Sequence, residues 1–328
     1  MAGASPPSLS VAVANAGGMG ACGALLMQPE AIRAWAEEFR RSSSGEFQIN
    51  LWIRDPETVR DAEAEARHRA FLGQWGPEVG PEMGEAVLPD FEAQCAAMLE
   101  AKPRVISSIM GLYAPAFVAE MKRRGILWFA TATTVAEART AEAAGADAII
   151  AQGAEAGGHR GSFQAAEAER RLVGLFALVP QVADAVRVPV IAAGGIGDGR
   201  GVAAALMLGA SAAMIGTGFL RCQESGIHAA YAERIGRTEA DETGLTRAFT
   251  GRAGRSIVND YVRAAANGSA PAPYPIQRGL TRPMREDAIR AGDAERMQMW
   301  AGQAAKYARA EPAGVVVRTL WEEAGHRE

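Results

Sequence analysis

Short apolar runs alternate with longer amphipathic segments along most of this chain, and no other feature constrains the fold as strongly. Each run is followed by Gly, Thr or Pro and then by a helical pattern, which is typical of βα units that build a parallel sheet. The strands predicted in this way are 19–24, 47–53, 104–110, 126–130, 146–151, 188–193 and 212–215. The sequence therefore predicts an α/β fold whose strands are buried on both faces.

The number of units points to a TIM (β/α)8 barrel, with a doubly wound sheet as the alternative. Seven runs are visible, and the helical pattern at 8–14 starts so close to Met1 that the first strand is truncated or missing. A missing strand is costly, because the N–H and C=O groups of its neighbours lose their partners. We therefore expect roughly ten further residues before this start, unless another segment, such as the C-terminal tail, covers the gap.

Two segments do not fit the repeat and suggest how the chain is divided. Residues 1–230 are expected to form the barrel, with a helical excursion at 55–100. Residues 231–283, rich in Gly, Arg and Pro, follow the last predicted strand, at the end of a barrel where active sites lie. We predict that they form a smaller, mostly helical cover over the site, and that helices in 284–328 pack back on the barrel.

Composition excludes several classes of protein. The formal net charge is -4 and no basic run interleaves with aromatic residues, so neither nucleic acid nor an anionic membrane is an expected partner. The three cysteines, Cys22, Cys95 and Cys222, are odd in number and far apart, which argues against a disulfide framework and a CxxC site. Glycines or prolines interrupt the uncharged stretches at 1–29 and 201–220, so we expect neither a signal peptide nor a membrane span. A reducing cytoplasm is the default location.

Two glycine-rich loops follow the last two predicted strands. GGIGDGRG, residues 194–201, lies between an apolar strand and an amphipathic helix, and IGTG, residues 215–218, repeats the arrangement one unit later. Backbone N–H groups in such loops bind anions, and TIM barrels frequently hold a phosphate after strands seven and eight. The loops therefore predict a phosphorylated ligand or cofactor. Gly18, Gly20 and Gly23 also spell GxGxxG, but a helical pattern precedes them, which disfavours a dinucleotide fold.

His159 is the candidate catalytic residue. It lies in AQGAEAGGHRG, residues 151–161, at the carboxyl end of a predicted strand, where barrel enzymes place reactive groups. Gln152 shares this loop and is a candidate ligand contact, while Glu155 is expected to be solvated or paired with Arg160. The sequence shows no Ser-His-Asp or Cys-His constellation and no metal motif, so a cofactor is expected to carry the chemistry.

These motifs together resemble those of a known family. NAGGMG (15–20), AQGAEAGGHRG (151–161), PVIAAGGIGDGRG (189–201) and GTGFLRCQES (216–225) look like successive signatures of the FMN-dependent nitronate monooxygenases. The match continues to MWAGQAAKYARAEPAG near the C-terminus, so it covers essentially the whole chain. A flavin enoyl-acyl carrier protein reductase shares the barrel and similar glycine-rich loops.

The resemblance implies an FMN site and a role for His159. The residues that it assigns to the cofactor are Met1, Ala2, Gly3, Asn50, Gln152, Gly157, Gly158, Gly194, Gly195, Gly216 and Thr217, the last four around the phosphate. His159 would act as the base for neutral nitroalkanes or as a hydrogen-bond donor to the anionic nitro group. Thr131 stands where some members have a lysine, so a charge near the flavin is absent here.

The activity implied by the resemblance is the oxidation of an alkyl nitronate by O2 to a carbonyl compound and nitrite. The expected partners are a small nitronate or nitroalkane and O2, with a homodimer possible. Two alternatives stay open: the enoyl reductase, which uses NAD(P)H, and a non-catalytic module that binds a phosphorylated ligand.

Overall fold

Seven strands form one parallel sheet in this computed structural model, which describes residues 3–56 and 58–325. In chain order and in sheet order the strands are β1 (Gly20–Gly23), β2 (Phe47–Trp52), β3 (Val105–Ile109), β4 (Leu127–Ala132), β5 (Ala148–Gln152), β7 (Val190–Ala193) and β8 (Ala212–Met214). Each lies within or overlaps one of the seven predicted runs. The predicted α/β barrel architecture is therefore confirmed, since parallel strands neighbouring one another in sequence order are the pattern of a TIM-type barrel.

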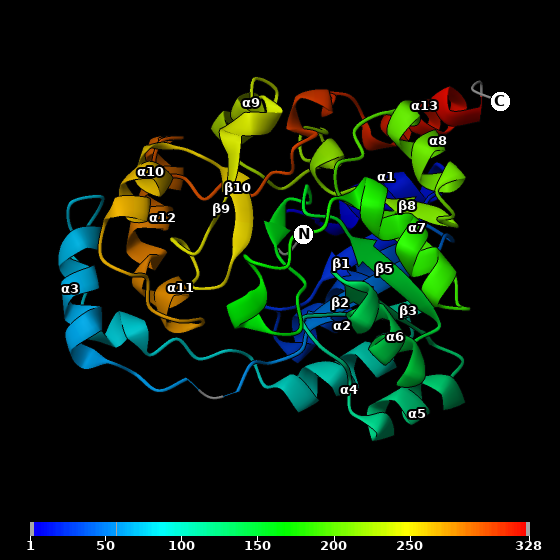
Figure 1. Ribbon diagram of the computed structural model, residues 1–328, viewed down its shortest axis with the longest axis horizontal. Coiled ribbons are helices and arrows are strands. Elements are labelled where there is room, and N and C mark those ends of the chain that lie inside the picture. Colours follow the sequence, from blue (N-terminus) through cyan, green and yellow to red (C-terminus); the bar gives the residue numbers. More distant parts are fainter. Residues whose placement is uncertain (1–2, 57, 326–328) are drawn as a thin grey trace.

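Helices cover the outer face of this sheet (Figure 1). They are α1 (Pro7–Asn15), α2 (Pro29–Ser42), α4 (Phe91–Ala101), α5 (Pro115–Arg123), α6 (Val135–Ala143), α7 (Leu175–Ala185), α8 (Gly199–Met207) and α13 (Ala313–Gly325). Their starts follow local chemistry: the Thr134 and Asp198 side chains accept hydrogen bonds from the first free N–H groups of α6 and α8. One apolar core, with Phe39, Ile49 and Trp128 fully buried, joins helices and strands.

The ring of strands is not closed by hydrogen bonds within the described residues. There, β1 pairs only with β2, and β8 pairs only with β7. Helix α13 packs against both α8 and α1, which lie on either side of this opening. The eighth strand expected before the helix at 8–14 is not among residues 3–56 or 58–325.

A second group of elements, which we call the cover lobe (58–84 and 229–300), lies beside the barrel on the left of Figure 1. Its elements are α3 (Ala62–Leu72), α9 (Ala229–Ile235), β9 (Thr243–Thr246), β10 (Gly254–Ile257), α10 (Asp260–Asn267), α11 (Ile276–Leu280) and α12 (Arg282–Ala291), and the barrel's β6 (Gly158–His159) joins β10 and β9 in an antiparallel sheet. Short 3-10 helices lie at Pro81–Gly84, Ala165–Glu167, Thr217–Phe219, Ala240–Glu242 and Ala305–Tyr307.

The boundaries drawn from the sequence differ from this arrangement in two places. In the excursion at 55–100, α3 joins the cover lobe and only α4 packs on the barrel. In 284–328, α12 also belongs to the cover lobe, and α13 alone returns to the barrel. The physical reason is a second apolar cluster, in which Leu72 of α3 and Met284 of α12 pack with Phe249 and Tyr261. The small antiparallel sheet was not predicted at all.

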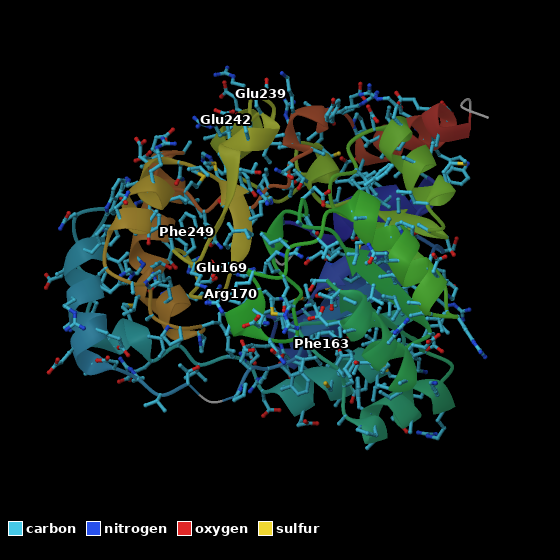
Figure 2. The ribbon with its side chains drawn as sticks, viewed as in Figure 1. Phe163, Glu169, Arg170, Glu239, Glu242 and Phe249 are labelled. Carbon is cyan, nitrogen blue, oxygen red and sulfur yellow. The ribbon has the colours of Figure 1, made fainter. Side chains whose placement is uncertain are left out.

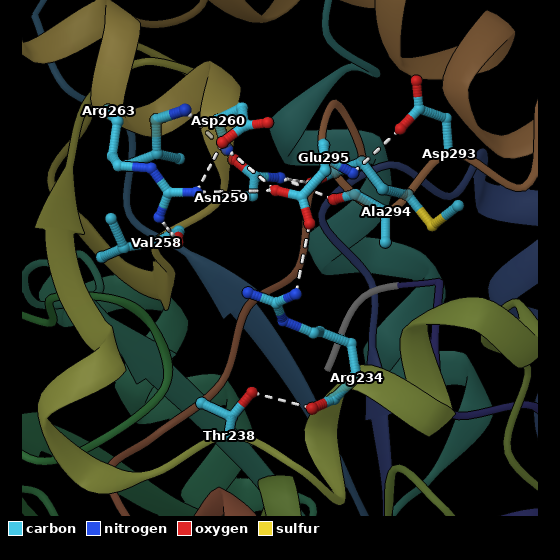
Figure 3. Close-up of polar contacts among 11 residues, drawn as sticks. Arg234, Thr238, Val258, Asn259, Asp260, Arg263, Asp293, Ala294 and Glu295 are labelled. Atoms are coloured by element: carbon cyan, nitrogen blue, oxygen red, sulfur yellow. Dashed lines mark hydrogen bonds and ion pairs between the residues drawn. The ribbon is translucent and has the colours of Figure 1, made fainter.

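Polar contacts complete the cover lobe. Glu295 accepts hydrogen bonds from Arg234 on α9 (3.2 Å) and from the N–H of Asp260 at the start of α10 (3.1 Å), as Figure 3 shows. The Asn259 side chain caps α10 and also donates to the carbonyls of Ala294 and Met297. The segment after α12 is thereby tied to two helices. No helix in the described residues is long and apolar enough to cross a membrane.

Candidate active site

Three glycine-rich loops meet at the carboxyl edge of the sheet. The last residue of β5, Gln152, stands beside Ala193 of β7, which in turn stands beside Met214 of β8. Each strand then leads directly into its loop, at 153–161, 194–198 and 215–218. Because parallel strands end at the same edge, the motifs singled out in the sequence lie side by side.

The loops after β7 and β8 offer free backbone donors. Gly194 and Gly195 have φ angles of +107° and +69°, and a Cβ at Gly194 would lie 2.8 Å from that of Ala156. Within the described part of the chain, the N–H groups of Gly195, Gly216 and Thr217 donate to no protein acceptor. A crowded loop with outward N–H groups is the arrangement that binds a phosphate. These residues therefore fit the phosphate end of a flavin.

The N-terminus of α8 adds no free N–H donors to this candidate phosphate site. Asp198 accepts hydrogen bonds from the N–H groups of Arg200 and Gly201, and Glu323 of α13 accepts one from Gly199 (3.1 Å). The N-terminus of a helix ordinarily favours a bound anion, because its free N–H groups and dipole carry partial positive charge. Two carboxylates already occupy that end, so the glycine loops themselves supply the donors.

The remaining residues assigned to the cofactor have varied surroundings. A Cβ at Gly157 would lie 2.4 Å from the nitrogen of Gly302, so this glycine lets two loops approach closely. Gly158 has a φ of +78° and pairs across β6 and β10. Gly3 lies next to Gly226, whose N–H donates to the carbonyl of Ala4. Met1 and Ala2 lie outside the described residues, so their assignment stays a prediction.

Asn50 and Gln152 are both engaged with protein groups. The amide nitrogen of Asn50 donates to the Ser107 hydroxyl (3.0 Å). The amide of Gln152 donates to the carbonyl of His159 (3.1 Å) and accepts from the N–H of Gly161 (2.8 Å). Gln152 thus fixes the loop that carries His159. Contact of either residue with a cofactor stays a prediction.

His159 stands where the barrel meets the cover lobe. Its ring lies between Trp52 at the end of β2 and Trp300, with centroid distances of 4.5 and 4.7 Å. Its Nε2 is 2.8 Å from the hydroxyl of Thr250, in the loop between β9 and β10. A ring held by two aromatic side chains and a hydrogen bond has a fixed orientation. His159 therefore lies in an ordered aromatic and polar environment, and its catalytic role stays a prediction.

The surroundings keep the His159 imidazole neutral. Burial, followed by the charges of Arg252 and Arg278, lowers the pKa of His159 to about 3. The Thr250 hydroxyl can donate to the carbonyl of Arg252 (3.2 Å) while it accepts a hydrogen bond from Nε2 of a neutral His159 ring (2.8 Å). In that arrangement Nδ1 carries the free lone pair, and no described residue bonds to it. His159 thus presents an unprotonated nitrogen.

Buried arginines hold the loop around His159. Arg160 donates to the carbonyls of Gln152 and Gly153, and Arg255 of β10 donates to that of Ala154 (3.0 Å). Arg252 donates to the carbonyl of Ser162 and forms an ion pair with Asp55. The expected pair between Glu155 and Arg160 is absent among the described contacts, since Glu155 accepts from the N–H of Leu175 instead.

Contacts from the cover lobe position the loop that bears Thr250. The carbonyl of Ala248 accepts hydrogen bonds from Tyr261 and Gln277, and that of Phe249 accepts one from Thr281. Arg247 pairs with Glu169 (2.9 Å), which Figure 2 shows between the barrel and Phe249 of the cover lobe. No sequence pattern indicated these residues, because the segments that carry them are far apart in the chain.

A cavity of about 440 Å³ opens beside this site. Trp52 and Tyr274 form part of its wall, and Leu51, Ile53 and Phe91 add apolar surface. The ring of Trp52 therefore contacts His159 and also borders the cavity. Arg54, Asp55 and Arg60 line it as well. No group of three or more His, Cys, Asp or Glu side chains suited to a metal occurs in residues 3–56 and 58–325.

Comparison with known proteins identifies the family. The family model for nitronate monooxygenase matches residues 1–323. A nitronate monooxygenase of Paraburkholderia phytofirmans is 40% identical over 98% of this chain and 90% of its own length. A structure of nitroalkane oxidase from Streptomyces ansochromogenes, 39% identical, covers 99% of this chain and 93% of that one, with a TM-score of 0.92. FabK from Thermotoga maritima is more distant: 28% identity, coverage of 98% and 90%, and a TM-score of 0.73. The chain belongs to the nitronate monooxygenase family and is an enzyme of the oxidoreductase class.

Proposed function

We propose that this enzyme binds FMN and uses O2 to oxidise small alkyl nitronates to a carbonyl compound and nitrite. The observation that carries the proposal is the neutral imidazole of His159, fixed between Trp52 and Trp300 at the edge where the glycine loops meet. Membership of the nitronate monooxygenase family supports the reaction class.

The glycine loops support FMN as the cofactor. Gly194, Gly195, Gly216 and Thr217 would hold its phosphate through their N–H groups, because those groups have no other acceptor among the described residues. When bound, FMN would take electrons from the substrate and pass them to O2. Gly3, Asn50, Gln152, Gly157 and Gly158 are the proposed neighbours of the rest of the cofactor.

His159 would serve as a proton acceptor when the substrate is a neutral nitroalkane. Its Nδ1 carries a lone pair, and the proton removed from the carbon next to the nitro group would move to it. The low pKa of His159 keeps the ring unprotonated over the whole ordinary pH range. A nitronate already lacks this proton, so it would need only binding and orientation.

The aromatic walls would exclude water and leave room for an alkyl group. Trp52, Trp300 and Tyr274 surround the approach to His159, and the adjoining cavity is large enough for a short chain. We therefore expect alkyl substituents to lie along Leu51 and Ile53. The small substrate and O2 are the proposed partners, and a homodimer is proposed alongside.

Two measurements test the proposal. The absorption spectrum of the purified protein should show a flavin that is released as FMN on denaturation. Oxygen uptake and nitrite release should follow addition of ethyl nitronate without NADH or NADPH. NADH oxidation with an enoyl thioester, and none with nitronate, would instead identify the reductase. A protein that binds no flavin would favour the other alternative, a non-catalytic module that binds a phosphorylated ligand.

A further inference from the structure

Arg278 on α11 is a positive charge without a partner in the described part of the chain. Its guanidinium has no hydrogen bond and no ion pair within the described residues. The buried Arg160, Arg252 and Arg255 all donate to carbonyl, hydroxyl or carboxylate oxygens. The half-buried Arg285 donates to the amide oxygen of Gln298. Arg278 is also partly buried, and burial lowers its pKa. A partly buried unpaired charge is costly, which makes it a candidate for binding an anion.

Tyr274, which lies just before α11, supplies a second unused donor. Its hydroxyl is buried and has no hydrogen-bond partner among residues 3–56 and 58–325. Its ring lies 5.4 Å from that of Trp52, which is in turn 4.5 Å from the His159 ring. Buried hydroxyl groups are normally hydrogen-bonded, and a bound ligand with an acceptor atom would supply the missing partner of Tyr274.

The rest of α11 faces the interior of the cover lobe. Gln277 and Leu280 are fully buried there, and a Cβ at Gly279 would lie 2.0 Å from the carbonyl oxygen of Met83. Arg278 is only partly buried, and its charge interacts with Tyr274, which lies just before α11. The charge of Arg278 also acts on His159, so both donors lie within electrostatic reach of the His159 site.

Arg278 adds a second positive charge near His159. Arg252 forms an ion pair with Asp55, whereas Arg278 has no carboxylate partner among residues 3–56 and 58–325. The charge of Arg278 acts on the imidazole, because it lowers the pKa of His159 in addition to burial and Arg252. The site thus carries a positive potential that an anionic substrate would neutralise.

We propose that Arg278 and the hydroxyl of Tyr274 together bind a planar oxyanion of the substrate beside His159. The planar guanidinium matches a group with two oxygens, which describes both a nitronate and a carboxylate, and the phenol adds a third hydrogen bond. This inference rests on the proposed function for the identity of the substrate. It concerns residues of the cover lobe that lie outside the sequence motifs quoted above.

Binding of unreactive oxyanions tests the pair without turnover. The holoenzyme is titrated with sodium nitrate and with sodium butyrate, and the change in tryptophan fluorescence gives the dissociation constants. Arg278→Met should weaken binding roughly tenfold to a hundredfold, and Tyr274→Phe by a smaller factor. Arg278→Lys should restore part of the affinity. Arg282→Met is the matched control, because Arg282 is an exposed arginine one turn further on, and it should bind like the parent.

Kinetics then identify which oxyanion is bound. If Arg278 holds the nitronate oxygens, Arg278→Met raises the KM for ethyl nitronate at least tenfold and leaves the KM for neutral nitroethane nearly unchanged. If it holds a carboxylate, only a nitronate that carries a terminal carboxylate is affected. Nitrate and butyrate binding that survives in both Arg278→Met and Tyr274→Phe overturns the proposal.

The melting temperature distinguishes anion binding by Arg278 from a purely structural role of this residue. Because Arg278 has no partner to lose, Arg278→Met should melt no lower than the parent enzyme. A lower melting temperature in Arg278→Met, with full anion affinity in Tyr274→Phe, would show a structural role and overturn the proposal. The anion titration needs no catalysis. Arg278-dependent binding in a protein that fails to oxidise nitronates would refute only the proposed function.

Discussion

The barrel and the cover lobe are stabilised in different ways. The barrel core consists mainly of aliphatic and alanine side chains on consecutive βα units, with Trp128 and Ile149 fully buried. The cover lobe buries a chain of polar groups as well: His68 bonds to Gln277 and Ser269, and Gln277 reaches the carbonyl of Ala248. Apolar burial tolerates small shifts, whereas a buried polar network depends on each partner. His159 lies between the barrel, whose core tolerates small shifts, and the cover lobe, whose polar network does not.

The largest effects should come from truncating one core or the other. Trp128→Ala in the barrel and Phe249→Ala in the cover lobe each remove a fully buried aromatic ring and should each cost about 3–5 kcal/mol. We expect Phe249→Ala to raise hydrogen exchange only in 58–84 and 229–300, and Trp128→Ala to raise it throughout. Equal exchange throughout in both variants would mean that the two lobes unfold as one unit.

The next effect concerns the residue between the lobes. His159→Asn should keep the flavin but lose roughly a hundredfold or more in kcat/KM for neutral nitroethane, the usual scale for a general base. Ethyl nitronate needs no deprotonation and should lose less. Thr250→Val, which removes only the hydroxyl bonded to His159, should lie between His159→Asn and the parent. An equal loss on both substrates in His159→Asn would point to orientation or charge stabilisation instead.

A smaller effect should come from the glycine-rich loop after β7 of the barrel, residues 194–198. Gly194→Ala places a Cβ 2.8 Å from that of Ala156 at a φ of +107°, which should cost about 1–3 kcal/mol and weaken FMN binding. Gly73→Ala is the control, since Gly73 has a φ of -61° and its nearest contact would be 3.6 Å. Flavin content and melting temperature measure the difference. Full FMN binding in Gly194→Ala would remove this loop from the phosphate site.

The smallest effect should be a pH dependence confined to the cover lobe. Burial lowers the pKa of His68 below its ordinary value of 6.5. The unfolded chain therefore binds this proton more readily, so the stability from neutral His68 is complete above pH 6.5 and decreases as the pH falls below it. Urea unfolding at pH 7.5 and 5.5 should show the loss in the parent and less of it in His68→Gln. Identical pH dependence in both proteins would contradict this assignment.

The sequence predicted the barrel well, because each strand and its loop are local features. The seven apolar runs, the glycines at 194 and 195 and the position of His159 all follow from short motifs. The surroundings of His159 do not. Thr250 and Trp300 reach it from distant segments, and the strands of the cover lobe are only four residues long. Their pairing depends on contacts that no local pattern encodes.

The cover lobe is built from segments that are far apart in the chain, and this affects folding during translation. Helix α3 leaves the ribosome between β2 and β3, while its apolar partners Phe249, Tyr261 and Met284 are synthesised only near the end. Domains generally begin to fold from the N-terminal side during synthesis. The nascent barrel must therefore assemble while Phe71 and Leu72 of α3 still lack their apolar partners. Slow synthesis of the last third of the chain would prolong the exposure of these two side chains.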